Sequence, residues 1–220
     1  MAELLRTHPL QAWSAAFERL AGTVGIAVEP FVAMVDVRLG AEAAARLDVD
    51  LPAVPNTWVP VGAGRAVWLG PDEWLLTSTT EPPDELEALV RAVVLPLGGA
   101  AADVSAQRIG LRLTGPRARD VLAKGCSIDL HPRVFRRGSS AQTTLGMAGI
   151  ILLALSDAGD EYLVLVRSSF AGYLADWLLD AALEFTAPSV HRYSGAEPCP
   201  PLPVWSSSER GSSAPTWPTS

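Results

Sequence analysis

The densest group of chemically reactive side chains lies between residues 124 and 132. Lys124 and Cys126 stand at the end of an expected helix, and His131 follows across a loop that also holds Asp129. A thiol beside a lysine and near a histidine is one arrangement of an activated nucleophile. However, the carboxyl end of a helix is partially negative and disfavours a thiolate. We therefore interpret Cys126 as structural, and His131 as a base without an evident partner except Asp129.

Two further groups could do chemistry. Asp72 and Glu73 are adjacent carboxylates, as general acid–base catalysis needs, but they follow a Gly-Pro pair, so turn polarity is the preferred interpretation. Trp58, Trp68 and Trp74 could stack a flat ligand such as a pterin. Packing in a core or an interface is the preferred role for these rings, and Trp68 and Trp74 are expected to meet across a hairpin.

Motifs for metals and nucleotides are missing from the sequence. Its histidines are His8, His131 and His191, its cysteines are Cys126 and Cys199, and none has the spacing of a zinc site. GxGxxG, P-loop and GxSxG motifs are also missing. The sequence therefore predicts no catalytic, cofactor-binding or metal-binding residue in this chain. Two cysteines form no disulfide framework and favour a reducing, cytoplasmic location.

The charge is unevenly distributed. The net charge of −7 argues against nucleic acid as a partner. Residues 105–140 nevertheless hold two acidic and eight basic residues, the latter being Arg108, Arg112, Arg117, Arg119, Lys124, Arg133, Arg136 and Arg137. This segment could attract an acidic partner surface, a phosphate or a polyglutamate tail, or it could simply form a solvated face.

Hydrophobic patterning predicts alternating strands and helices. The expected strands are 31–39, 66–69, 73–77, 109–113, 150–155 and 162–166, and the expected helices are 41–47 and those beginning near 82, 114 and 168. The order of elements repeats, and residues 37–47 resemble 111–122. We therefore expect an α+β domain over 1–186 made of two ferredoxin-like repeats, about 31–104 and 105–186.

The expected helices have apolar faces, and the end of the chain has none. The helix near 82 should bury Leu86, Leu89, Val90, Val93 and Val94. In the helix near 114, Ala118, Val121 and Leu122 should face inward. The last helix should bury Phe170, Tyr173, Leu174, Trp177, Leu178 and Ala181. Residues 187–220 are rich in Pro and Ser and are expected to be a disordered tail. No apolar run is long enough for a membrane span, and the first residues do not look like a signal peptide.

Several runs carry a family resemblance. The two most specific are Lys124-Gly-Cys-Ser-Ile-Asp-Leu-His-Pro and Arg167-Ser-Ser-Phe-Ala-Gly-Tyr-Leu-Ala-Asp-Trp-Leu. They are joined by Trp68-Leu-Gly-Pro-Asp-Glu-Trp-Leu-Leu, Asp103-Val-Ser and Ala141-Gln-Thr. Over residues 1–186 the chain resembles the gamma subunit of heterotetrameric sarcosine oxidase.

The resemblance implies a cytoplasmic complex of alpha, beta, gamma and delta subunits that oxidatively demethylates sarcosine to glycine. It implies the fold of the folate-binding region of aminomethyltransferase-type proteins. It places FAD, FMN, NAD, tetrahydrofolate and zinc in partner subunits, and gives this chain an assembly role without an active site.

Two alternatives to the assembly role remain. A stand-alone folate-binding aminomethyltransferase-like protein would need a complete pterin pocket in this chain. A related RNA-modification protein shares the Lys-Gly-Cys core, but Ser127, Ile128, Asp129 and Leu130 depart from its pattern.

Overall fold

The computed structural model describes residues 8–20, 22, 24–47 and 49–186, so the expected tail over 187–220 lies outside the described residues. Its strands are β1 (Gly25–Glu29), β2 (Ala33–Arg38), β3 (Trp58–Val61), β4 (Gly64–Gly70), β5 (Glu73–Ser78), β6 (Ala100–Asp103), β7 (Arg108–Thr114), β8 (Ser140–Leu145), β9 (Ala148–Ala154) and β10 (Glu161–Arg167). Its α-helices are α1 (Ser14–Glu18), α2 (Ala41–Ala44), α3 (Pro83–Val94), α4 (Ala118–Ala123) and α5 (Ala171–Thr186), with 3-10 turns η1 (Gln11–Trp13), η2 (Leu95–Leu97) and η3 (Ser168–Phe170).

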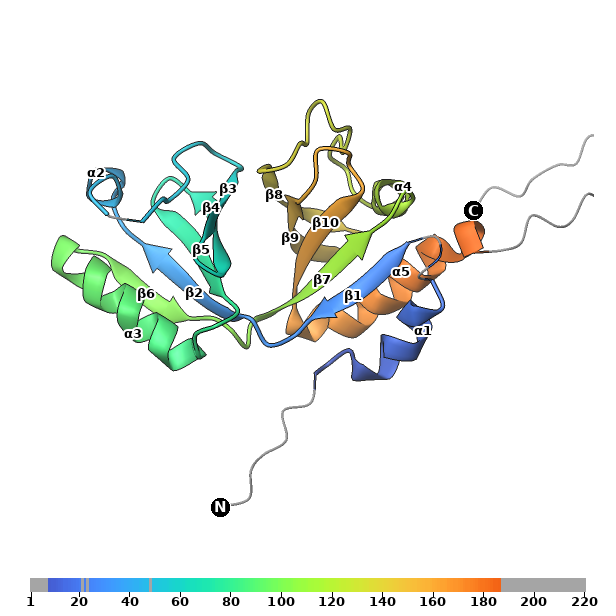
Figure 1. Ribbon diagram of the computed structural model, residues 1–220, viewed down its shortest axis with the longest axis horizontal. Helices are drawn as coiled ribbons and strands as arrows, with labels where there is room; N and C mark the ends of the chain where they lie inside the picture. The colour runs from blue at the N-terminus through green and yellow to red at the C-terminus, as the bar shows by residue number, and fades with distance from the viewer. Residues whose placement is uncertain (1–7, 21, 23, 48, 187–220) are drawn as a thin grey trace, which may run out of the picture. The chain divides into compact units, whose positions relative to one another are not determined.

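The strands form two antiparallel sheets (Figure 1). The first sheet has the order β3-β4-β5-β2-β6, and the second has the order β1-β7-β10-β9-β8. The expected combination of helices with antiparallel sheets is therefore confirmed. The sequence analysis did not anticipate the edge strands β1, β3, β6 and β8, because none of them has a sustained run of large apolar residues. β1 lies before both expected repeats in the chain, yet it pairs with β7 in the second sheet.

The first sheet is covered on one face by α3 (Figure 1). Val94, Leu86 and Val90 of α3 pack against Val35 and Val37 of β2. The predicted inward position of two other α3 residues is wrong, because the side chains of Leu89 and Val93 are 60% and 49% exposed. The physical reason is that α3 packs on β2 and the edge strand β6, and the sheet does not extend far enough to cover the whole apolar stripe.

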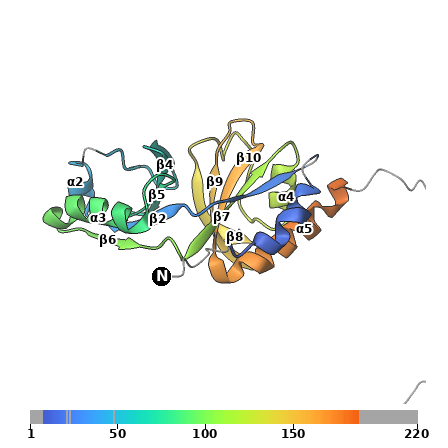
Figure 2. The ribbon, with the colours of Figure 1, turned by 60° about the horizontal axis from the view of Figure 1, so that its bottom comes forward.

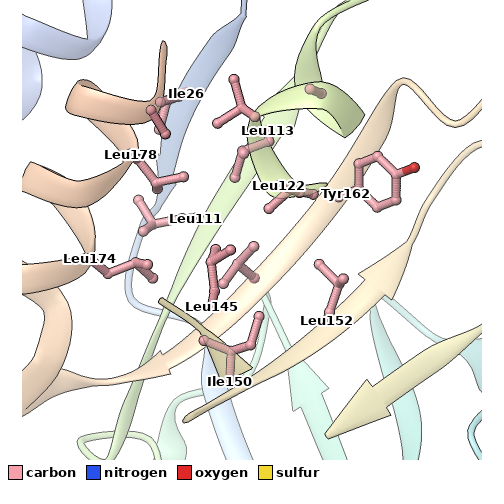
Figure 3. Close-up of a cluster of buried hydrophobic side chains, with 14 of the residues drawn as sticks. Ile26, Leu111, Leu113, Leu122, Leu145, Ile150, Leu152, Tyr162, Leu174 and Leu178 are labelled. Atoms are coloured by element: carbon pink, nitrogen blue, oxygen red, sulfur yellow. The ribbon is translucent and has the colours of Figure 1, made fainter. Parts of the chain in front are cut away.

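The second sheet is covered by α1, α4 and α5, and Figure 3 shows the core between them. Leu111 and Leu113 of β7 point into this core, where they meet Leu174 and Leu178 of α5. Ala118, Val121 and Leu122 of α4 are fully buried, as the sequence predicted. Two members of the expected stripe are exposed, since Phe170 in η3 and Tyr173 in the first turn of α5 are 43% and 40% exposed.

A third group of buried side chains joins the two sheets. Trp58, Val67 and Leu75 of the first sheet pack in one cluster with Leu153 and Leu163 of the second. Figure 2 gives a second view of the two sheets and of the helices on them. Among the described helices, none has the length and apolar character that crossing a membrane would require.

Candidate functional site

Cys126 lies in the core rather than in an open site. Its backbone N–H donates to the carbonyl of Leu122 at 2.9 Å, and the residue forms an isolated β-bridge with Leu145 at the end of β8. Cys126 is only 9% exposed, as part of the cluster beneath the second sheet. These contacts fit the structural interpretation of the thiol.

The lysine and the histidine of the same segment have other partners. Lys124 Nζ lies 2.8 Å from Glu184 Oε1, hydrogen-bonds to the carbonyl of Ala181, and lies 4.6 Å from the ring centre of Phe185, all on α5. The Nδ1 atom of exposed His131 accepts the backbone N–H of Arg133 at 3.2 Å. In the described part of the chain no hydrogen bond joins either side chain to Cys126, so the segment is not assembled as a nucleophile and base.

Asp129, the only acid beside this group in the sequence, also hydrogen-bonds to the backbone. Its Oδ1 accepts the N–H of His131 at 2.8 Å, which shapes the loop rather than orienting the imidazole ring. Gly125, between the lysine and the cysteine, allows the backbone to pack closely against α5. A side chain there would place its Cβ 2.4 Å from the ring of Trp177 on α5. The Lys-Gly-Cys run is therefore a joint between α4, α5 and β8.

The carboxylates Asp72 and Glu73 are held by one arginine. Arg38 Nη2 lies 2.8 Å from Glu73, Nη1 lies 3.5 Å from Asp72, and Nε lies 3.9 Å from Asp36. Burial, and then the charge of Asp36, raises the pKa of Glu73 against the opposing charge of Arg38. The sequence analysis missed Asp36 and Arg38, which reach the turn from β2. These ion pairs agree with the interpretation that Asp72 and Glu73 are polar residues of a turn rather than a catalytic acid and base.

The three tryptophans do not form one stacking site. Trp68 and Trp74 lie directly opposite each other on β4 and β5, which confirms the expected cross-strand pair. Trp74 is 3% exposed and donates its indole N–H to the carbonyl of Pro52 at 2.9 Å. Trp58 belongs to a different cluster, between the sheets, and donates to the carbonyl of Ala154 at 3.0 Å. All three rings therefore contribute to packing.

The charged site that the structure does assemble lies where the two sheets meet. Glu29 of β1 accepts Arg112 Nη2 at 2.7 Å, and Arg112 Nη1 donates to Glu161 of β10 at 2.7 Å. Arg65 of the first sheet lies 4.0 Å from Glu29. Burial lowers the pKa of Arg112, but hydrogen bonds and charges from both glutamates outweigh that effect and raise the pKa overall. This network joins β4 to three strands of the second sheet.

Gly110 makes room for that network. A Cβ at Gly110 would lie 3.2 Å from the Cβ of Glu29, a tight contact that glycine avoids where the glutamate crosses β7. The signal in the sequence is the alternation along β7. Arg108, Gly110 and Arg112 alternate with Ile109 and apolar leucines, so they occupy one face of the strand.

A cavity of about 360 Å³ lies at the two connections between the sheets. Its walls include Phe31 and Val32 from the first connection, Ser105 and Ala106 from the second, and Arg108 at the start of β7. Phe31 has a φ of +26°, a strained conformation for a bulky residue. It is 54% exposed, and its ring lies edge-on to that of His8 at 5.9 Å.

The basic segment 105–140 does not form one continuous patch. Arg112 and Lys124 are used in the ion pairs above, and Arg117 lies 2.8 Å from Asp120. Arg133, Arg136 and Arg137 are exposed in the loop before β8. Within 8–20, 22, 24–47 and 49–186, no three or more His, Cys, Asp and Glu side chains are grouped as a metal site. His191 and Cys199 lie outside those ranges.

The two antiparallel sheets with a shared core give the chain an α+β fold that is similar to the fold of an aminomethyltransferase. Glycine cleavage system aminomethyltransferase T from Bartonella henselae matches 74% of this chain and 48% of its own, with a TM-score of 0.54 and 14% identity. At this identity the match concerns the fold alone.

The chain belongs to the sarcosine oxidase gamma subunit family, whose family model matches residues 31–184. Sarcosine oxidase subunit gamma of Corynebacterium sp. strain U-96 is 39% identical over 151 residues, which cover 67% of this chain and 70% of the relative. The corresponding subunit of Arthrobacter sp. is 35% identical over 198 residues, 84% of this chain and 94% of the relative.

A solved structure agrees with these relatives. A chain of the heterotetrameric sarcosine oxidase from Corynebacterium sp. U-96, in complex with pyrrole 2-carboxylate, matches with a TM-score of 0.75 and 32% identity. The match covers 85% of this chain and 100% of that chain. The resemblance drawn from the motifs is confirmed.

Proposed function

We propose that this chain is a subunit of a heterotetrameric sarcosine oxidase and acts in assembly rather than in catalysis. The observation that carries the proposal is the match to a whole chain of such a complex, at a TM-score of 0.75. The proposed partners are alpha, beta and delta subunits, and the proposed reaction of the complex is the oxidative demethylation of sarcosine to glycine.

The exposed apolar side chains support a role in assembly. Leu89, Val93, Leu95 and Leu97, here named the α3 outer face, are 60%, 49%, 62% and 39% exposed. The first two lie on α3 and the other two in the 3-10 turn η2 that follows it. Exposed apolar patches commonly mark protein interfaces. None of these four residues belongs to the described core cluster between α3 and the first sheet, so a partner subunit could cover them.

The chemistry of the complex is proposed for other subunits. FAD, FMN, NAD, tetrahydrofolate and zinc are assigned to the partners, because this sequence has none of the motifs that bind nucleotides or zinc. A cytoplasmic complex is part of the same proposal, since a chain with two cysteines suits a reducing compartment.

We further propose that the two sheets are two ferredoxin-like copies. The support is their order, because β6-β2-β5-β4-β3 corresponds position by position to β1-β7-β10-β9-β8. In the second copy, the strand equivalent to β6 is β1, which precedes the first copy in the chain.

A permuted chain tests this correspondence. If residues 24–30 are moved behind residue 186, the second sheet should still form, as measured by amide exchange. Loss of protection in β7 would contradict the proposal.

Co-expression tests the main proposal. The chain alone should show no flavin absorbance and oxidise no sarcosine. With the alpha, beta and delta subunits it should co-purify, and leaving it out should lower the yield of soluble complex. Yellow, active protein from this chain alone would overturn the assembly role.

The stand-alone folate-binding alternative has one structural feature in its favour. Trp68 and Trp74 line a cavity of about 290 Å³ with several alanines. The nearly complete burial of Trp74 leaves little of its ring for stacking. Titration of the chain with tetrahydrofolate decides between the two functions, and low-micromolar binding would favour the alternative.

A further inference from the structure

Two arginines face each other at one end of the second sheet. Arg108 begins β7 and Arg167 ends β10, and the antiparallel register places them directly opposite each other. Directly opposed residues of two strands project from the same face, and like charges in such a pair destabilise the sheet. The two guanidinium groups therefore repel each other where the chain could have used a neutral pair.

Neither arginine is neutralised by an acid in the part of the chain that the structure describes. The described ion pairs include no carboxylate within 4.0 Å of either guanidinium. Arg108 donates to the neutral Oε1 atom of Gln107. Asp36 and Glu73 act on Arg108 only at longer range, and both are also close to Arg38.

Both arginines line a cavity of about 390 Å³ whose other walls are part polar and part apolar. Thr144 and Gln142 alternate with Thr143 along β8, so these two side chains share one face of the strand. Gln142 is held in place by a 2.7 Å hydrogen bond from its Nε2 to the carbonyl of Leu69. Nothing lies within 4 Å of the position where Gly149 would carry a Cβ. The cavity is therefore open beside the arginines and offers several hydrogen-bonding groups.

We propose that Arg108 and Arg167 form an oxyanion-binding site for a small molecule that carries a carboxylate or phosphate group. Planar guanidinium groups suit such groups because each can donate two parallel hydrogen bonds. The cavity volume falls within the range of small-molecule sites. Arg108 also lines the neighbouring cavity of about 360 Å³, where Phe31 and Ile109 provide apolar walls for the rest of the ligand.

The energetics of the free chain agree with this site. Burial, and then the charge of Arg167, lowers the pKa of Arg108 from its ordinary value. A bound oxyanion would offset this repulsion. The two guanidinium groups therefore repel each other in the free chain, and binding of an anion between them would be favoured.

Calorimetric titration of the full chain tests the site, with inorganic phosphate and succinate as probes and sodium chloride of equal ionic strength as the blank. Saturable binding is expected in the wild type. Arg108→Gln and Arg167→Gln should each weaken it at least about tenfold, because each removes a charge-assisted hydrogen bond. Arg167→Lys should retain part of the affinity. The matched control is Arg137→Gln, which removes the same charge from an exposed loop outside the cavity.

A second measurement separates binding from folding. Without ligand, Arg108→Gln and Arg167→Gln should raise Tm by about 1–4 °C, because the repulsion is removed. A lower Tm in both variants would overturn the proposal. So would binding that is equal in all variants, or an effect of phosphate that chloride reproduces.

The source of the oxyanion is tested in the assembled complex. If Arg167→Gln assembles normally but no longer binds phosphate or succinate, the result would support a free small molecule as the source of the oxyanion. Loss of assembly in both arginine variants, but not in Arg137→Gln, would overturn the small-molecule proposal in favour of an acidic residue of a partner subunit.

Discussion

A single oxygen of Glu29 on β1 accepts two hydrogen bonds from Arg112 on β7. The distances from Oε1 are 2.7 Å to Nη2 and 3.2 Å to Nε. Glu29 lies opposite Gly110 in the register, so its side chain reaches diagonally over the glycine to the arginine. Arg65 approaches the other carboxylate oxygen at 4.0 Å from the first sheet. Glu29 therefore links the two sheets as well as two strands.

Glu29→Gln should destabilise the chain by about 1–3 kcal/mol, because it leaves two partly buried guanidinium groups with a weaker partner. Urea unfolding measures the change. Asp120→Asn is the matched control, since it breaks the solvent-exposed pair with Arg117 at 2.8 Å and should cost less than about 0.5 kcal/mol. Equal losses in the two variants would contradict a special role for the network.

Gly125→Ala should destabilise the joint between α4 and α5. The added Cβ would lie 2.4 Å from the Trp177 ring, and overpacking of this kind costs about 1–3 kcal/mol. Thermal unfolding and tryptophan fluorescence measure the effect. Gly40→Ala is the control, because nothing lies within 4 Å of its added Cβ. Unchanged stability in Gly125→Ala would show that Trp177 can move aside.

Cys126→Ser should leave turnover per flavin of the assembled complex within a few-fold of the wild type. The substitution should act through packing and cost about 1–2 kcal/mol, because it buries a hydroxyl in an apolar cluster. Cys126→Ala separates polarity from the loss of the thiol. A hundredfold loss of turnover in both variants, with normal assembly, would mean that the thiol does chemistry.

Leu89→Ser combined with Val93→Ser should weaken assembly about tenfold or more while leaving the fold of the chain intact. Both side chains lie on the α3 outer face and are largely exposed in the chain. Co-purification with the partner subunits measures assembly, and thermal unfolding measures the fold. Val54→Ser, at a side chain that is 64% exposed elsewhere, is the matched control. Normal assembly of the double variant would exclude the α3 outer face as an interface.

Tyr162→Phe should make stability less sensitive to alkaline pH. Burial raises the pKa of Tyr162 from its ordinary value of 10.0 to about 12. The neutral phenol is favoured in the folded chain, so the unfolded chain releases its proton first. Stability is therefore retained below pH 10.0 and falls as the pH rises towards about 12. Urea unfolding over this range should show a shallower fall for Tyr162→Phe, and parallel curves would contradict the shift.

The sequence by itself determined the elements with strong local periodicity. The apolar pattern of residues 109–113 predicted a strand, and β7 (Arg108–Thr114) contains this range. The buried positions of α4 and the cross-strand pair of Trp68 and Trp74 were predicted in the same way, because each depends on spacing within one element or one hairpin.

Only the tertiary structure decided what depends on residues far apart in the chain. No local pattern showed that β1 would pair with β7, that Arg65 would approach Glu29, or that α3 would rest on an edge strand and leave Leu89 exposed. The opposition of Arg108 and Arg167 likewise follows from strand register. The physical reason is that periodicity records only which face of an element is apolar. Pairing between strands and the extent of burial depend on which other elements meet that face.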